Sequence, residues 1–174
     1  VERYRFQPTP EQTAISFRFM RWRDADTVEL AQFAEVDATT CEYLSNYPTP
    51  RRTALAPGLH GLSNGDLDEP WPKTLALKER LAAWVASGED DVSPLWDALA
   101  DETRADDTRL PDTGVGLELE RMLSAAFIRD ARYGTRASTL IAIDHAGHGW
   151  ISERRFGPEG VFEGETTLRI GPGA

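Results

Sequence analysis

The sequence predicts an α+β fold with antiparallel sheets, and three patterns along the chain support this class. Apolar residues alternate over Ala14–Trp22, which is typical of a half-buried strand. The middle of the chain has helical apolar spacing at Leu77, Leu81 and Trp84. The apolar run Leu140–Ile143 is followed by a glycine-rich turn and a second β-rich run, which predicts an antiparallel hairpin. Strands at both ends of a helical middle are typical of α+β proteins.

The N-terminal third is expected to hold two strands and one short helix. The first twelve residues are polar and contain two prolines, so we expect an irregular lead-in to the first strand. Asp24 is a suitable N-cap for a helix over Asp26–Val36. Glu42–Asn46 is predicted as a short strand, because the proline-containing turn Tyr47–Pro50 follows it.

Two helices are predicted in the middle of the chain. Ala56–Pro72 is dense in glycine and proline and is expected to be irregular. A helix then runs from Lys73, with Pro72 in its first turn and Gly88 at its end. We expect its core face to consist of Leu77, Leu81, Trp84 and Val85. A second helix is predicted to start with Ser93 as N-cap, and its apolar face consists of Leu95, Trp96 and Leu99.

The last third is predicted to begin with a helix and to continue with strands. Leu110–Gly116 is a glycine- and proline-containing connection, and Leu117–Leu123 is expected to form a short helix. Ser138–Asp144 is continuously apolar in its centre, which predicts a central strand. Trp150–Phe156 is predicted as the returning strand, and Val161–Ile170 as an edge strand.

Composition restricts the possible partners. The chain has 174 residues, 40% of them hydrophobic, which is enough for one domain with a core. Its formal net charge of -10 disfavours nucleic acids and anionic membrane surfaces, although five Arg among residues 1–23 make that segment basic. No apolar run is long enough to span a bilayer. Cys41 is the only cysteine, so an internal disulfide is excluded, and we expect a reducing, cytoplasmic location.

Three segments, in this order and spacing, resemble the NRDE family, the transport and Golgi organization 2 relatives. Tyr43–Asn46 is similar to a further element of that family. The resemblance extends from about Tyr43 to Gly164. The three segments are Ala56–Asn64 with Leu67–Lys73, then Leu110–Glu118, and then Phe127-Ile128 with Tyr133–Thr139.

The resemblance implies an N-terminal nucleophile hydrolase-like fold, an αββα sandwich of two antiparallel sheets between helical layers. Members of this family carry a Cys directly after the initiator Met, followed by an Asn-Arg-Asp-Glu motif. In that superfamily the thiolate attacks an amide carbonyl and the α-amine of the same residue acts as base. Animal relatives are linked to Golgi organisation, secretion and haem trafficking.

This sequence departs from the family pattern near its start. It has no Cys in its first residues and no Asn-Arg-Asp-Glu motif. We therefore expect only part of the αββα sandwich, and a truncated, frameshifted or excised reading frame. The chain divides into a non-matching segment 1–42, a family region 43–164 and a tail 165–174.

Five residues are predicted to line a pocket. Asn64 ends the Gly-Leu-Ser-Asn stretch, where its amide can donate to an oxyanion, or alternatively bond its own backbone in a turn. Arg136 precedes the predicted central strand and can hold a substrate carboxylate, or alternatively pair with a nearby acid. Tyr133, Thr135 and Asn46 complete the candidate pocket.

Other chemistry-bearing residues favour structural interpretations. Cys41 is read as a small apolar residue, and its release as a new N-terminal nucleophile is the alternative. His145 and His148 flank a turn and are expected to be exposed, with metal binding as the alternative. Haem ligation by His60 is a further alternative. Trp71 is expected to anchor the following helix, and Asp112 to act as a cap rather than as half of a carboxylate pair with Glu118.

The sequence therefore predicts a binding protein for a small ligand, with no resident cofactor, no metal and no turnover by this chain. Haem or another small hydrophobic molecule is the expected ligand, within a role in secretion and Golgi organisation. The alternative is amide hydrolysis by a full-length parent that supplies the N-terminal nucleophile. A further alternative is an isolated half-domain, whose exposed sheet edges would make it unstable.

Overall fold

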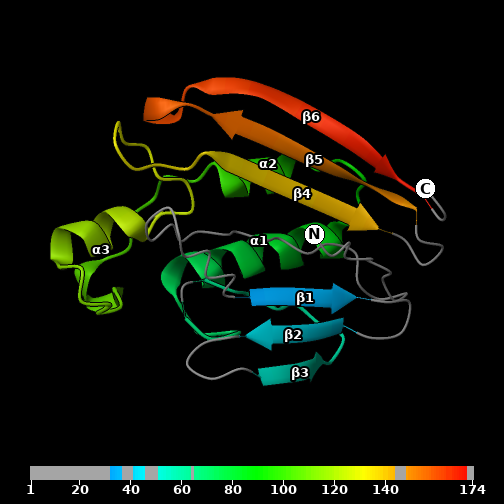
Figure 1. Cartoon of the computed structure of the whole chain (residues 1–174), viewed down its shortest axis with the longest axis horizontal. Helices are drawn as coiled ribbons and strands as arrows, with labels where there is room; N and C mark the ends of the chain where they lie inside the picture. The colour runs from blue at the N-terminus through cyan, green and yellow to red at the C-terminus, as the bar shows by residue number, and fades with distance from the viewer. Residues whose placement is uncertain (1–31, 37–40, 46–50, 64, 144–147, 172–174) are drawn as a thin grey trace, which may run out of the picture. The chain divides into compact units, whose positions relative to one another are not determined.

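A computed structural model describes residues 32–36, 41–45, 51–63, 65–143 and 148–171 of the chain (Figure 1). The predicted strand over Ala14–Trp22 and the turn at His145 lie outside the described residues, as do Asn46 and Asn64. The described residues form a mixed α and β structure with two three-stranded sheets. The predicted α+β class is confirmed.

The chain divides into two compact units, which are described separately. The first comprises the described residues within Val1–Gly58, Leu140–Ile151 and Thr167–Ala174. The second comprises Leu59–Thr139, apart from residue 64, together with Ser152–Thr166. The second unit contains the three α-helices of the described residues and most of the three family-like segments.

The first sheet has the order β1-β2-β3 and is antiparallel throughout. It consists of β1 (Gln32–Val36), β2 (Cys41–Ser45) and β3 (Arg51–Leu55). The strand predicted at Glu42–Asn46 is confirmed over the described residues. The helix predicted over Asp26–Val36 is wrong where it can be followed, because Gln32–Val36 pairs residue by residue with Ser45–Cys41. A weak apolar spacing does not fix local structure when a neighbouring strand supplies a complete hydrogen-bonding partner.

Helix α1 (Pro72–Ser87) confirms the first predicted helix. Gly88 ends it with a φ of 66°, the left-handed conformation that glycine adopts without steric cost. The expected core face is only partly right. Val85 is exposed, and Leu77, Leu81 and Trp84 are half-buried, whereas Thr74 is the buried residue of this helix.

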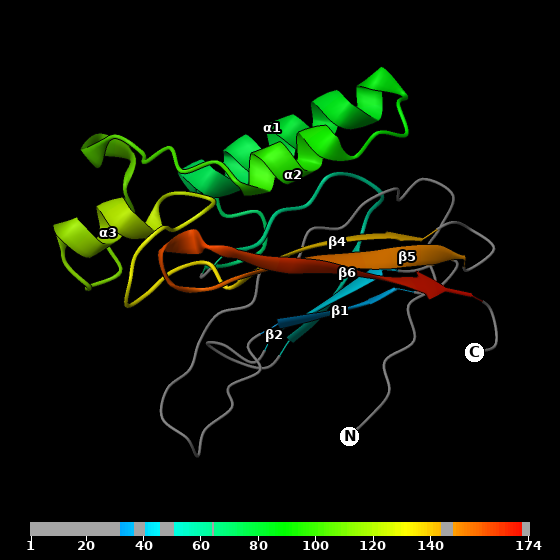
Figure 2. The same cartoon turned by 90° about the horizontal axis from the view of Figure 1, so that it is seen from above.

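Helix α2 (Ser93–Leu99) lies beside α1 in two perpendicular views (Figures 1 and 2). Leu95 and Trp96 are buried, as predicted. Ser93 lies in the first turn of the helix rather than at the N-cap, which is Val92. The reason is local, because the Ser93 hydroxyl and amide both donate to Asp91 Oδ1, at 2.7 and 2.9 Å.

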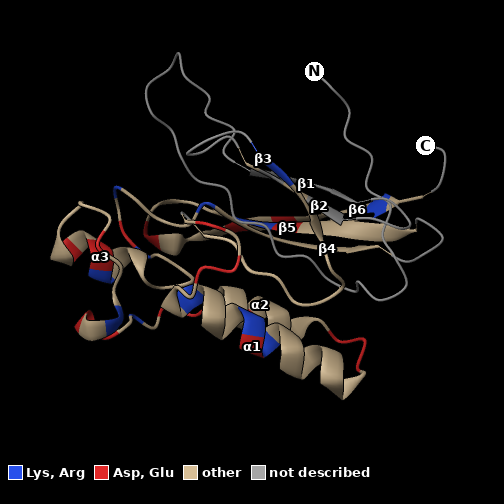
Figure 3. Ribbon diagram, turned by 90° about the horizontal axis from the view of Figure 1, so that it is seen from below, with Lys and Arg blue, Asp and Glu red and all other residues tan. Residues whose placement is uncertain are grey.

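Helix α3 (Leu117–Leu123) has the predicted bounds, and the connection before it contains one short 3₁₀ turn, Asp107–Arg109. Acidic and basic residues are interspersed on α1 and α3 (Figure 3). On α3 the usual polarity is inverted, because Leu117 and Leu119 are exposed and Glu120 is buried.

The second sheet has the order β4-β5-β6, with strands that alternate in direction (Figure 1). Its members are β4 (Ala137–Ile143), β5 (Gly149–Phe156) and β6 (Phe162–Ile170), which confirms the predicted hairpin and the predicted last strand. The prediction that β4 is central is wrong for the described residues, where β5 is the middle strand. Apolar runs report burial of the two faces rather than the number of hydrogen-bonded neighbours, and only Leu140 of this run is buried.

Candidate functional site

The loop before α1 is organised around the carboxylate of Asp68. Its Oδ2 accepts a hydrogen bond from His60 Nδ1 at 2.7 Å. Its Oδ1 accepts from the Lys78 ammonium at 2.6 Å and from the Gly61 amide at 2.8 Å. The Asp68 amide in turn donates to the Gly61 carbonyl at 2.7 Å. Four hydrogen bonds therefore hold the two ends of this loop together and attach it to α1.

The electrostatics of Asp68 follow from these contacts. Burial alone would raise the pKa of its carboxyl group, but hydrogen bonds from Lys78, His60 and the Gly61 amide outweigh burial and lower the pKa from 3.8 to about 2. The carboxylate is thus ionised at neutral pH. An ionised acceptor on Nδ1 requires a proton on that nitrogen, which fixes the orientation of the His60 ring.

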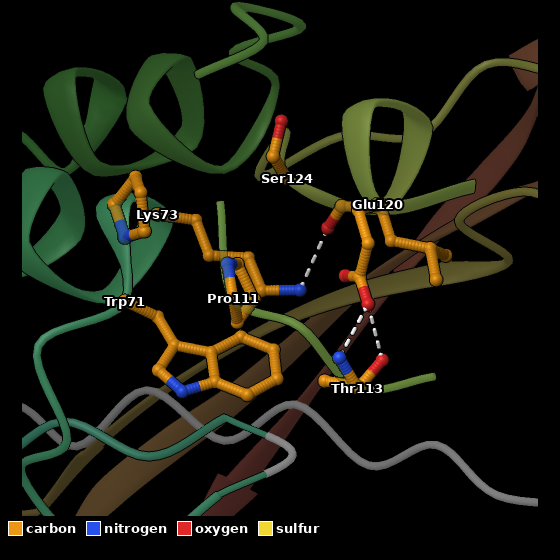
Figure 4. Close-up of a pocket in the computed structure, with 8 residues that line it drawn as sticks. Trp71, Lys73, Pro111, Thr113, Glu120 and Ser124 are labelled. Carbon is orange, nitrogen blue, oxygen red and sulfur yellow. Dashed lines mark hydrogen bonds between the residues drawn. The ribbon is translucent and has the colours of Figure 1, made fainter. Parts of the chain in front are cut away.

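A small pocket lies beside the N-terminus of α1 (Figure 4). Its walls come from two of the family-like segments and from α3: Trp71, Pro72, Lys73, Pro111, Thr113, Glu120, Leu123 and Ser124. Its cavity volume is about 20 Å³, room for one water-sized group. The pocket can therefore hold one edge or one functional group of a ligand.

Lys73 supplies the positive charge of this pocket. Its ammonium donates to the Leu123 carbonyl at 2.9 Å, as Figure 4 shows, and lies 5.6 Å from the centre of the Trp71 ring. Within the part of the chain that the structure describes, the indole Nε1 of Trp71 and the hydroxyl of Thr74 are buried without a hydrogen-bond partner. Unsatisfied buried donors cost free energy, so these two groups are candidates for contact with water or a ligand.

Glu120 ties α3 to the loop in front of it. Its Oε1 accepts from both the amide and the hydroxyl of Thr113, at 2.7 and 2.5 Å (Figure 4). Asp112 instead accepts from the Gly114 amide at 3.1 Å within the turn, and it does not cap α3, whose N-cap is Gly116, so the expected helix-capping role is not seen. Glu118 pairs with Arg121. The structure gives Asp112 and Glu118 separate partners.

The third family-like segment closes a loop around Thr135. The Thr135 hydroxyl accepts from the Ile128 amide, and the Thr135 amide donates to the Ile128 carbonyl, both at 2.9 Å. Asp130 Oδ1 accepts from the amides of Arg132 and Tyr133 at 2.9 and 3.1 Å, which lowers the pKa of Asp130. Thr135 is therefore a buried structural residue of this loop.

The five predicted pocket residues have different places. Thr135 is buried, whereas Tyr133 and Arg136 are exposed. Within the described residues no ion pair joins Arg136, and its carbonyl accepts from the Phe156 amide at 2.8 Å. Asn64 and Asn46 lie outside the described residues. Their participation in one pocket stays a prediction.

Asp68, Lys78 and Glu120 are the site residues that sequence reasoning missed. Asp68 has a φ of 60°, a conformation that Asp tolerates better than most residues, and its place in a glycine-rich loop was the available signal. Lys78 lies four residues after Thr74 on α1, next to the face that the sequence predicts as core. No sequence pattern indicates that its ammonium pairs with Asp68 in the preceding loop. Glu120 lies on a short helix for which the sequence predicted no buried face, so nothing marked its carboxylate as buried.

The fold and the site together define an α+β protein with antiparallel sheets. Hydrogen bonds of the polar side chains Asp68, Glu120 and Thr135 hold its family-like loops in place. The family model for Transport and Golgi organisation 2 matches residues 18–158, and the chain belongs to this family. This match begins before residue 43, so the division of the chain at residues 42 and 164 stays a prediction.

Mammalian relatives have the same family name. A mouse Transport and Golgi organization 2 homolog is 34% identical over 122 residues, which cover 64% of this chain and 44% of the relative. A human Transport and Golgi organization protein 2 homolog is 32% identical over 134 residues, covering 71% and 48%. The matched region thus spans about half the length of the curated relatives.

Two further features concern metals and membranes. None of the helices in the described part of the chain is both long and apolar enough to cross a bilayer. Among those same residues, no three His, Cys, Asp or Glu side chains gather closely enough to hold a metal ion.

Proposed function

We propose that this chain binds a small hydrophobic ligand, of which haem is the leading candidate, as part of a role in secretion and Golgi organisation. The family membership supports the cellular role, and the arrangement of His60 on Asp68 supports the ligand class. We further propose that the chain works in the cytoplasm without a nucleic-acid partner. We also propose that its two sheets belong to an αββα sandwich.

His60 is the single observation that carries the ligand proposal. Its Nδ1 is held by a carboxylate at 2.7 Å, and its side chain is 29% exposed. Histidines that ligate metals through one ring nitrogen commonly donate a hydrogen bond to a carboxylate from the other. When bound, haem would supply an iron that can accept an electron pair from an imidazole nitrogen. His60 would hold that iron, and Asp68 would fix the orientation of the His60 ring.

The pocket beside α1 supports the same proposal. Trp71, Pro72 and Pro111 form apolar walls, and the Lys73 ammonium supplies one cation. A carboxylate at the edge of a planar apolar ring matches this combination, because the pocket has room for one such group, which can pair with the Lys73 ammonium. Lys78 links His60 to the same helix through Asp68.

The alternative is amide hydrolysis by a full-length relative that supplies an N-terminal nucleophile. The two hydrogen bonds between Gly61 and Asp68 support it, because both residues belong to the family-like segment in which Asn64 is the predicted oxyanion donor. We propose no turnover by the described residues themselves. Among their buried polar residues, Glu120 and Thr135 already make structural hydrogen bonds.

Haem titration of the full chain tests the ligand proposal. We expect a saturable shift of the Soret band, and loss of the axially ligated spectrum in His60→Ala. The matched control is His148→Ala, which removes an exposed histidine and should leave the titration unchanged. Absence of a saturable shift, or an equal loss in both variants, would contradict the proposal.

A screen with acyl-amides separates the two functions. The chain should release no product from any of them. Turnover that disappears in Cys41→Ala would instead support nucleophilic catalysis by this chain and would argue against a purely binding role.

A further inference from the structure

Glu120 brings a buried carboxylate to the wall of the pocket beside α1. The residue is only 5% exposed, and its Oε1 accepts both hydrogen bonds that Thr113 donates, at 2.7 and 2.5 Å. Within the described residues, no hydrogen bond is made to its other oxygen, Oε2, and the carboxylate makes no ion pair. One oxygen therefore holds the loop, and the other can accept a hydrogen bond from a ligand.

Lys73 brings a donor to the same pocket. In Figure 4 its ammonium points towards the Glu120 side chain. An ammonium carries three N–H donors, of which the Leu123 carbonyl accepts one at 2.9 Å. Lys73 and Glu120 are the ionisable residues among the eight that line the pocket. A ligand group in this pocket therefore meets a donor from α1 and an acceptor from α3.

The other charged groups next to Glu120 are engaged elsewhere. On α3, Arg121 pairs with Glu118 and with Asp107. In the preceding loop, Asp112 accepts a hydrogen bond from a turn amide at 3.1 Å. The ligand group is thus recognised by the pair of Lys73 and Glu120.

An ionised carboxylate matches only half of this pair. One of its oxygens can accept from the Lys73 ammonium, but the other would then face the Glu120 carboxylate. Two carboxylates at close range repel each other, and one shared proton removes the repulsion. A neutral carboxyl group or a primary amide matches both residues, because each carries a carbonyl acceptor and an O–H or N–H donor on the same carbon.

We infer that the pocket binds a terminal carbonyl group whose neighbouring atom carries a proton, at the edge of an apolar ring. The inference rests on the proposed function, in which such an edge enters the pocket. The carbonyl oxygen accepts from Lys73, and the O–H or N–H donates to Glu120 Oε2. A carboxylate ligand must then take up one proton from solvent, which it shares with Glu120 in the complex, whereas an amide brings its own. Glu120 is therefore the residue that determines specificity.

Benzoate and benzamide are matched probes, because they share the ring and differ only in this group. Their affinities for the full chain can be measured by NMR titration at pH 6, 7 and 8. Uptake of one proton makes benzoate binding proportional to the proton concentration, so its affinity should fall about tenfold for each unit of rising pH. Benzamide needs no added proton, and its affinity should stay constant.

Glu120→Gln should invert this preference. The new amide oxygen can still accept from Thr113, so the loop keeps its hydrogen bonds. The new N–H₂ group donates to benzoate without an added proton, so benzoate should bind independently of pH and more tightly than to the wild type at pH 8. Benzamide loses its acceptor and should bind about tenfold more weakly. Glu118→Gln, an exposed position on the same helix, is the matched control and should behave as the wild type.

Three results would overturn the inference: benzoate binding to the wild type that does not change with pH, no binding of either probe, or an unchanged preference in Glu120→Gln. The probes contain no iron and do not involve His60. A Soret shift that His60→Ala abolishes, together with any of these three results, would overturn this inference and leave the haem proposal standing. Absence of the Soret shift together with the expected probe behaviour would do the reverse.

Discussion

Asp68 shows how much one side chain can determine in a glycine-rich loop. Its backbone has a φ of 60°, an unusual conformation for a residue with a Cβ atom. The conformation is tolerated because three donors converge on its carboxylate. The same carboxylate orients His60, so the stability of the loop and the geometry of the proposed ligand site depend on one group.

The first prediction concerns the pH dependence of the hydrogen bonds that the Asp68 carboxylate accepts from His60, Gly61 and Lys78. The folded pKa of Asp68, about 2, lies below the ordinary 3.8, so its contribution to stability is fully present above pH 4 and is lost as the pH falls towards 2. Because the Asp68 side chain is 35% exposed, we expect its ionisation to contribute roughly 1 kcal/mol to the free energy of unfolding after solvent screening. Urea unfolding at pH 6 and pH 3 should show Asp68→Asn losing about half of its disadvantage at pH 3, because the folded carboxyl group, with a pKa of about 2, is still mostly ionised there.

The matched control for this prediction is Asp90→Asn, an exposed acid between α1 and α2. Its unfolding free energy should follow that of the wild type at both pH values. If Asp68→Asn were equally destabilised at pH 6 and pH 3, the ionised state of the Asp68 carboxylate would not be what stabilises the loop.

At the scale of elements, the predictions succeeded where local signals were strong. Pro72 and Gly88 bracket α1 in the sequence and in the structure, and α3 has the bounds that were predicted. Exposure was harder to predict. Val85 was assigned to the core and is exposed, because apolar periodicity identifies a face but not how completely its neighbours cover it.

Strands in the N-terminal part were less predictable for a physical reason. β1 was assigned to a helix, and β3 was not anticipated. β3 carries two adjacent arginines and is exposed over four of its five residues, so it lacks the alternation that marks a half-buried strand. Both strands are defined by their pairing with β2 rather than by their own residues.

The second prediction tests the loop that leads into β4. A Cβ atom at Gly134 would lie 2.8 Å from the Ile128 carbonyl oxygen and 3.2 Å from that of Asp130. Both neighbours are backbone atoms that other hydrogen bonds hold in place. We therefore expect Gly134→Ala to destabilise the chain by about 1–3 kcal/mol, visible as a lower urea midpoint with an unchanged slope.

Gly171→Ala is the control for this substitution, because no atom of the described residues beyond its chain neighbours lies within 4 Å of the Cβ position there. It should leave the urea midpoint unchanged. A Gly134→Ala variant as stable as the wild type would mean that the loop around Thr135 yields easily, and that it is not a rigid support for Tyr133 and Arg136.

For the whole molecule, the sequence predicted the family but only part of the site. The segments that carry the resemblance supplied Trp71, Lys73, Pro111 and Thr113 to one pocket. Of the predicted pocket residues, Tyr133 and Arg136 are exposed and Thr135 makes buried structural hydrogen bonds, so a pocket that they share stays a prediction. Motifs identify which segments matter, whereas the side chains that meet are decided by long-range contacts such as Lys78 to Asp68 and Glu120 to Thr113.

Hydrogen exchange of the full chain, with and without haem, is the most direct test of the central claim that the loop before α1 and the loop before α3 form the ligand site. We predict slower exchange on haem addition in peptides that cover residues 59–75 and 110–123. Slower exchange confined to the region around His148, or no change in either predicted region, would contradict the account.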